Sequence, residues 1–299
     1  MSEPSLNFIS CPDAQGGHRM AYWEWNETGD AAHPHVVVCV HGLSRQGRDF
    51  DVLAQALCQR VRVVCPDIAG RGRSDWLKDP AGYQLPNYAA DMFTLLAQLQ
   101  ARTVDWVGTS MGGLIGMAIA GFQPPGEAGA EAPSPLRRLV LNDVGPAIEF
   151  AAIQRMTDYI GADPRFRTEQ EAVDYLWSLS ASFGPHTPEQ WLALSRPMLR
   201  RDGDGYKLHY DPAIGAAIKA VTPESAAQGE ALLWQLYDHI RARTLLLRGA
   251  ESDLLSRETA RAMTQRGPRA QLLEFAGIGH APTLVASDQV QAVTNFLLG

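Results

Sequence analysis

The sequence predicts an α/β protein built on a mostly parallel sheet. Short runs rich in Val and Leu, several without polar alternation, are typical of strands buried on both faces. Stretches with helical apolar spacing separate many of these runs, and this succession indicates parallel strands with helices on both faces of the sheet. The 299 residues are 45% hydrophobic and 20% charged, so the chain can bury a large core.

The expected sheet has eight strands. The first two, "NFISC" (7–11) and "HRMAYWEWNE" (18–27), alternate well enough to form an antiparallel hairpin at a sheet edge. The other six strands are expected at 35–40, 61–66, 104–107, 137–143, 243–249 and 270–275. Helical spacing occurs at 50–60, 87–101, 113–123, 256–266 and 287–298.

One stretch, residues 146–230, contains no apolar strand run. It shows helical patterns at 148–161, 168–182 and 188–200, followed by the turn-rich segment "DGDGYKLHYDP". We interpret it as a mainly helical cap inserted after the sixth strand, with 1–145 and 231–299 as the core. Five aromatic residues of this insertion are candidates either for its own core or for a pocket wall: Tyr159, Trp177, Phe183, Trp191 and Tyr206.

Composition restricts the possible partners and location. The net charge is −7 and no Lys/Arg run exceeds two residues, which disfavours a nucleic-acid surface and favours a small-molecule partner. The four cysteines lack a C-x-x-C spacing and are expected to be reduced. No signal peptide or 18-residue apolar stretch is visible, so a cytoplasmic protein that does not enter a membrane is expected. The Pro/Gly/Ala-rich segment 123–135 is expected to be a surface loop.

Ser110 is the candidate nucleophile, in the stretch "VDWVGTSMGGLIGM" (104–117). A G-x-S-x-G motif alone is a weak signal, but here it follows a strand-like run and opens a helix-like one. Ser110 would then stand on a sharp strand-to-helix turn, with Gly108 and Gly112 where side chains would collide. The N-terminus of the following helix would favour an anion developing beside the serine.

A serine hydroxyl needs a base, and the base needs an acid to orient it. His280 is the best placed of eight histidines, because it follows the last apolar strand in "FAGIGHAPT". Asp253, in "GAESDLLS" after the preceding strand, is the expected acid. Glu251 and Asp143 remain as alternatives. The order Ser, Asp, His differs from the orders of chymotrypsin and subtilisin.

Two backbone N–H groups are expected to form an oxyanion hole. The "VHGL" segment (40–43) would turn the N–H of Leu43 toward the serine, and the N–H of Met111 would be the second donor. His41 is interpreted as bracing this loop. Neither a metal nor an organic cofactor is expected, because no His-rich ligand spacing appears and "DIAGRGRSDW" (67–76) lacks the third glycine of a dinucleotide motif.

Together these motifs resemble the α/β-hydrolase fold family over nearly the whole chain. The resemblance is carried, in the family's order, by VHGL, PDIAGRGRS, GTSMGG, the Asp in GAESD and the His in GIGHAP. It implies an eight-stranded core and a cap between the sixth and seventh core strands by the family's numbering. Ser110 stands where haloalkane dehalogenases and epoxide hydrolases of this family carry Asp, which disfavours those activities.

The expected reaction is hydrolysis of a carboxylic ester, including a lactone, through an acyl-enzyme on Ser110. One alternative is C–C bond hydrolysis of meta-cleavage-type diketones, but the related enzymes tend to carry Trp after the catalytic His, where this chain has Ala281. A second alternative, from a different class, is a non-catalytic small-molecule receptor on the same fold. One fold serves many chemistries, so the site must decide between them.

Overall fold

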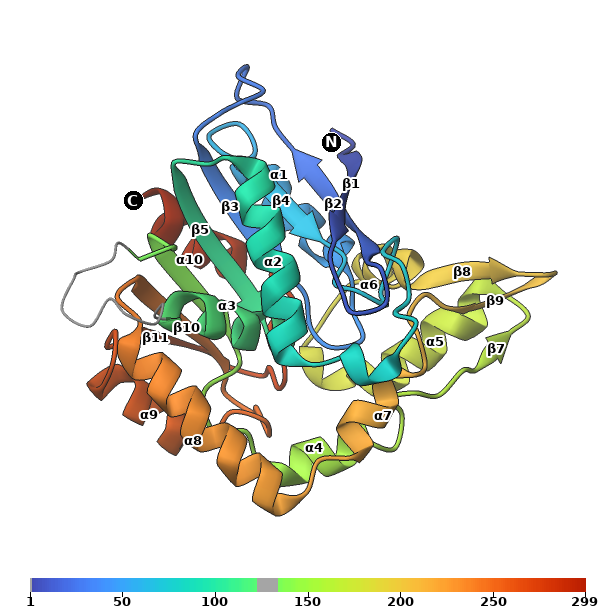
Figure 1. Ribbon diagram of the computed structural model, residues 1–299. Coiled ribbons are helices and arrows are strands. Elements are labelled where there is room, and N and C mark those ends of the chain that lie inside the picture. The colour runs from blue at the N-terminus through green and yellow to red at the C-terminus, as the bar shows by residue number, and fades with distance from the viewer. Residues whose placement is uncertain (1, 123–133) are drawn as a thin grey trace.

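The computed structural model describes residues 2–122 and 134–299, and it contains the expected eight-stranded sheet (Figure 1). The strand order is β1-β2-β4-β3-β5-β6-β10-β11. The strands are β1 Ser5–Cys11, β2 His18–Trp25, β3 His35–Val40, β4 Arg62–Pro66, β5 Thr103–Thr109, β6 Arg138–Asn142, β10 Arg243–Gly249 and β11 Gln271–Phe275. Most of the expected loop at 123–135 lies outside the described residues.

The sheet is antiparallel only on one side. β1 pairs antiparallel with β2 and β2 with β4, whereas the pairs from β4 through β11 are parallel. The central strand β3 shows why the apolar runs lack alternation, because Val36 through Val40 are all fully buried. Both faces of the sheet are therefore covered, as the composition of the runs predicted.

Helices cover the two faces of the sheet. α1 (Asp51–Leu57) and α10 (Ser287–Leu298) pack together on one face. α2 (Leu85–Leu99), α3 (Met111–Gly121) and α8 (Pro223–His239) form a second group in which α3 contacts both of the others, and α9 (Arg257–Gln265) packs beside β11. Short 3₁₀ helices occur at Gly47–Phe50, Pro80–Gly82, Ala181–Phe183 and Arg196–Met198.

The insertion between β6 and β10 is less helical than expected. Its helices are α4 (Phe150–Met156), α5 (Glu169–Ser180), α6 (Pro188–Ser195) and α7 (Ile214–Lys219). A small sheet of order β7-β9-β8, from Arg165–Phe166, Gly205–Leu208 and Leu199–Asp202, projects to one side (Figure 1). The expected boundary at residue 230 falls inside α8, which packs on α3, so this helix covers the core. The division into core and cap otherwise stays a prediction.

The sheet order places the candidate chemistry at one edge. β5, β6, β10 and β11 are neighbours and parallel, so the loops that follow them share the carboxyl edge, where ligands of open α/β sheets bind. Within the described ranges, no helix combines the length and hydropathy that a bilayer crossing requires.

Candidate active site

Ser110 occupies the strand-to-helix turn that the sequence predicted. It follows β5 directly, precedes the first residue of α3, and has φ 51° and ψ −118°, a strained conformation for a residue with a side chain. The N–H of Ser110 donates to the carbonyl of Asn142 at 3.0 Å, and its own carbonyl accepts from Gly113 at 2.8 Å. These bonds hold the turn in place beside the end of β6.

The backbone around Ser110 is so closely packed that only glycine fits at positions 108 and 112. A Cβ at Gly108 would collide with the carbonyl of Gly112, and one at Gly112 would collide with the carbonyl of Val40. The indole N–H of Trp106 also donates to the Gly112 carbonyl at 3.0 Å. The first turn of α3 is therefore pressed against β3 and β5, and this contact fixes the direction of the serine.

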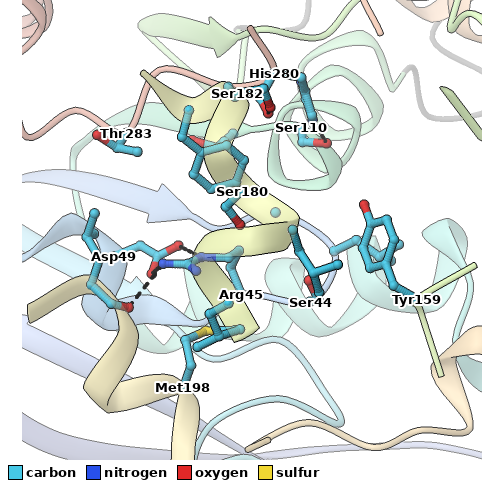
Figure 2. Close-up of a pocket in the computed structure, with 18 of the residues that line it drawn as sticks. Ser44, Arg45, Asp49, Ser110, Tyr159, Ser180, Ser182, Met198, His280 and Thr283 are labelled. Atoms are coloured by element: carbon cyan, nitrogen blue, oxygen red, sulfur yellow. Dashed lines mark hydrogen bonds and ion pairs between the residues drawn. The ribbon is translucent and has the colours of Figure 1, made fainter. Parts of the chain in front are cut away.

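His280 lies within hydrogen-bonding distance of the serine. Its Nε2 is 3.0 Å from the Ser110 Oγ, and its side chain is 14% exposed. The loop that carries it contacts the insertion, because the N–H of Gly279 donates to the Ser182 carbonyl at 2.7 Å. The structure thus brings together the predicted nucleophile and base, and both line the same cavity (Figure 2).

The carboxylate that contacts His280 belongs to Asp143. The Nδ1 of His280 donates to Asp143 Oδ2 at 2.7 Å. Asp143 follows β6 directly and is fully buried. Its Oδ1 accepts from the N–H of Gly249 at 2.8 Å, and its Oδ2 also accepts from the Ser252 hydroxyl at 2.6 Å. These donors satisfy a buried charge and set its orientation toward the imidazole.

The expected pairing of His280 with Asp253 is wrong. Asp253 forms an ion pair with Arg155, and the two side chains are 46% and 50% exposed. The reason is distance along the loop: β10 ends at Gly249, so Asp253 lies four residues past the strand, where the chain has turned toward α4. Glu251, the other alternative, is exposed.

The "VHGL" loop lies against the nucleophile. A Cβ at Gly42 would be in ordinary contact with the Cβ of Ser110, at 3.7 Å. Within the described part of the chain, the N–H groups of Leu43 and Met111 donate to no backbone or side-chain acceptor. Leu43 lines the same cavity as Ser110, and Met111 directly follows the serine in the chain.

His41 braces this loop, as interpreted from the sequence. It is fully buried, its Nδ1 donates to the Gly42 carbonyl at 2.7 Å, and its Nε2 accepts from the N–H of Ile68 at 3.0 Å. Burial lowers the pKa of His41 to about 3. A neutral imidazole with both nitrogens occupied is a structural element rather than a base.

A cavity between the insertion and the carboxyl edge contains the reactive side chains (Figure 2). Its lining includes hydroxyl groups of Ser44, Tyr159, Ser180 and Ser182, among apolar side chains contributed mainly by the insertion. Besides His280, the lining residues of the described chain whose side chains can carry a charge near neutral pH are Arg45, Asp49 and Arg155. The cavity is therefore mostly apolar with a few polar groups, as small-molecule sites are.

The aromatic residues of the insertion divide into two groups. Tyr159 and Phe183 line the cavity. Trp177, Trp191 and Tyr206 are absent from the lining among the described residues, so for these three the pocket-wall alternative is wrong. Trp191 is 5% exposed, stacks edge-on against Trp177 with ring centres 5.0 Å apart, and donates to the Val173 carbonyl at 3.2 Å. Trp191 therefore belongs to the core of the insertion, and Trp177 packs against it from the surface.

A group of possible metal ligands lies away from this cavity. Cys11, His18 and Asp91 bring one ligand atom each within 4.8 Å of one another. Both ring nitrogens of His18 are already held, by Asp91 at 3.0 Å and Asp13 at 3.1 Å, and the hydrogen bond to the Asp91 carboxylate raises the pKa of His18. The cluster ties the β1-β2 hairpin to α2.

Comparisons with known proteins agree with this geometry. A model described as the alpha/beta hydrolase family matches residues 37–293. A 3-hydroxybutyrate-oligomer hydrolase of Cupriavidus necator is 48% identical over 302 residues, covering 100% of this chain and 99% of the relative. A pimeloyl-[acyl-carrier protein] methyl ester esterase of Xanthomonas axonopodis is 26% identical over 285 residues, covering 89% and 96%. The crystal structure of an alpha/beta hydrolase from Novosphingobium aromaticivorans superposes with a TM-score of 0.83 at 32% identity, covering 99% of each chain.

The chain therefore belongs to the alpha/beta hydrolase family. This membership confirms the fold and the class, a hydrolase, that the sequence predicted. The acid that contacts His280, Asp143, was one of the two alternatives to Asp253 that the sequence left open. The signal that could have favoured it is its position, because it directly follows the strand "RLVLN", which the structure places between β5 and β10.

Proposed function

We propose that the protein is a serine hydrolase that cleaves the ester bonds of short 3-hydroxybutyrate oligomers through an acyl-enzyme. One observation carries the reaction type: the hydrogen-bonded series from Ser110 through His280 to Asp143, with 3.0 Å and 2.7 Å between its polar atoms. The substrate class is supported by the 48% identity with the Cupriavidus necator hydrolase over the full length of both chains.

The reaction follows from the positions of these three side chains. The Ser110 Oγ attacks the ester carbonyl while the Nε2 of His280 takes the hydroxyl proton. The resulting imidazolium gives that proton to the departing alkoxide, which leaves as the hydroxyl group of the released fragment. Asp143 orients the ring through Nδ1 and stabilises its positive charge. Water, deprotonated by His280 in the same way, then attacks the acyl-enzyme and restores Ser110.

The oxyanion of each tetrahedral intermediate needs donors that are already in place. The N–H groups of Leu43 and Met111 supply them, since both are free and adjoin the nucleophile. Met111 is also the first residue of α3, so the positive end of that helix dipole adds to the stabilisation.

The location and the partner follow from the same proposal. The substrate is a small ester rather than a nucleic acid or a membrane surface. We infer a cytoplasmic location, supported by the four cysteines of the chain: Cys11, Cys39, Cys58 and Cys65 are all buried and unpaired in the structure.

The direct experiment incubates the purified protein with 3-hydroxybutyrate dimer and trimer and measures the released monomer. A series of p-nitrophenyl esters, a lactone and a meta-cleavage-type diketone are compared by kcat/KM. We expect ester cleavage to exceed diketone cleavage, with the Ser110→Ala variant as the blank. A higher kcat/KM for the diketone would contradict the proposal. Labelling of Ser110 by a fluorophosphonate without turnover of any ester would instead indicate a receptor.

A further inference from the structure

The two arginines that line the cavity differ in how their charge is balanced. The Nε and Nη2 of Arg45 each donate to Asp49 at 2.7 Å, and Nη2 also donates to the Leu194 carbonyl at 3.1 Å (Figure 2). The Arg45 side chain is only 11% exposed. A second carboxylate placed on this pair would leave an excess negative charge in a poorly solvated place, which is unfavourable.

Arg155 has a different environment. It lies in the last turn of α4 and lines the cavity, yet its side chain is 50% exposed, so it lies where the cavity opens. Its partner Asp253 comes from the loop after β10, is similarly exposed, and is absent from the cavity lining among the described residues. Because an ion pair between exposed side chains contributes little free energy, another carboxylate can take the place of Asp253 at small cost.

We propose that Arg155 binds the free terminal carboxylate of a linear hydroxyalkanoate oligomer, and that Asp253 is the resident anion which this carboxylate displaces. The inference rests on the proposed function, and it adds the part of the substrate that is recognised. A guanidinium suits this task, since its planar set of donors matches both oxygens of a carboxylate.

This arrangement distinguishes linear acids from their neutral relatives. A linear dimer ends in a carboxylate, whereas its methyl ester and a lactone carry no such charge. The carboxylate would remain partly hydrated at the opening while the apolar part of the oligomer enters the cavity. The enzyme is then expected to prefer the free-acid dimer to its methyl ester, and added salt should weaken that preference because both charges are exposed.

Substitutions of the two partners of the ion pair should change the preference for the free-acid dimer over its methyl ester in opposite directions. Removing the arginine charge in Arg155→Gln removes the attraction for the substrate carboxylate. Removing the competing anion in Asp253→Asn makes Arg155 more available. A pair that only supports the fold would not give opposite effects, because either substitution breaks the same contact.

The experiment measures kcat/KM for the 3-hydroxybutyrate dimer and for its methyl ester with the full-length protein, and reports the ratio of acid to ester. We expect Arg155→Gln to lower this ratio about tenfold, which corresponds to about 1.4 kcal/mol. We expect Asp253→Asn to raise it about threefold, as fits an exposed pair. Arg155→Lys is the control that keeps the charge but not the planar set of donors, and its ratio should lie between those of the wild type and Arg155→Gln.

Two results would overturn the inference. One is a shift of the ratio in the same direction in Arg155→Gln and Asp253→Asn, and the other is no shift in either variant. If Arg155→Gln fails to fold, the increase expected in Asp253→Asn still decides the question. Cleavage of p-nitrophenyl butyrate without cleavage of dimer or methyl ester would overturn the proposed substrate, and this inference with it, and that pattern differs from both results above.

Discussion

The loops that follow β6 and β10 begin at the same edge of the sheet and each carries an aspartate, but they place it in different surroundings. Asp143, directly after β6, is fully buried and accepts hydrogen bonds from His280, Ser252 and Gly249. Asp253, four residues after β10, is about half exposed and pairs with Arg155 of the insertion. One carboxylate is held by the core, and the other faces the insertion.

The difference shows what a catalytic carboxylate requires. A buried charge must have its hydrogen bonds supplied by the protein, and those bonds also restrict its orientation. A half-exposed carboxylate keeps its water and stays free to exchange partners. The sheet order adds to this, because β6 lies between β5, which carries Ser110 at its end, and β10. The loop after β10 still contributes, through the Ser252 hydroxyl that positions Asp143.

The largest effect is expected from Ser110→Ala, which removes the covalent route. We expect kcat for p-nitrophenyl butyrate to fall on the order of 10⁴-fold or more, with the fold retained. Circular dichroism and thermal unfolding provide the check on folding. Turnover above a tenth of the wild-type rate would show that this edge of the sheet does not supply the nucleophile.

A smaller effect is expected from Ser252→Ala. The Ser252 hydroxyl donates to Asp143 Oδ2 and accepts the N–H groups of Leu254 and Leu255, at 3.3 Å and 3.1 Å. Its loss would leave Asp143 less well held, so we expect kcat to fall about tenfold with KM little changed, as fits one hydrogen bond to a charged group. Ser252→Thr, which keeps a hydroxyl, is the rescue control. A fall in stability with an unchanged kcat would indicate that Ser252 only supports the loop.

The smallest effect on selectivity is expected from the tryptophans of the insertion. Trp191→Ala should lower the free energy of unfolding by about 3–5 kcal/mol, as for other buried Trp truncations. Trp177 is 38% exposed, so Trp177→Ala should lower the free energy of unfolding by less than Trp191→Ala does. Since neither lines the cavity, both variants should keep the wild-type ranking of ester chain lengths, measured as kcat/KM. A changed ranking in either variant would mean that the insertion shapes the site through its own core.

Much of the fold could be predicted from the sequence, because buried parallel strands lack polar alternation and the glycines around Ser110 mark a crowded turn. All eight strands of the main sheet were expected. Strand β7 was not, because two residues, Arg165 and Phe166, carry no periodicity. Residues 199–200 were included in a helix because the same apolar spacing suits either structure, whereas they begin strand β8.

The site could be predicted only in part. Ser110 and His280 stand in short segments whose glycines and position identify them, so their approach to within 3.0 Å was foreseeable. The identity of the acid could not be predicted in this way, because Asp143 and Asp253 both follow apolar strands. The sequence does not show which of the two loops turns away from His280. The aromatic residues of the insertion posed the same difficulty, since burial in a core and exposure to a cavity use the same residue types.

The central claim is that Asp143, rather than Asp253, completes the series that activates Ser110. The most direct measurement compares kcat for p-nitrophenyl butyrate in Asp143→Asn, Asp253→Asn and Glu251→Gln. We expect Asp143→Asn to lower kcat by about 10³- to 10⁴-fold, because an amide fixes the imidazole in the wrong tautomer and does not stabilise its charge. Asp253→Asn should retain more than a tenth of wild-type kcat, and Glu251→Gln should match the wild type. A larger loss in Asp253→Asn than in Asp143→Asn would contradict the account.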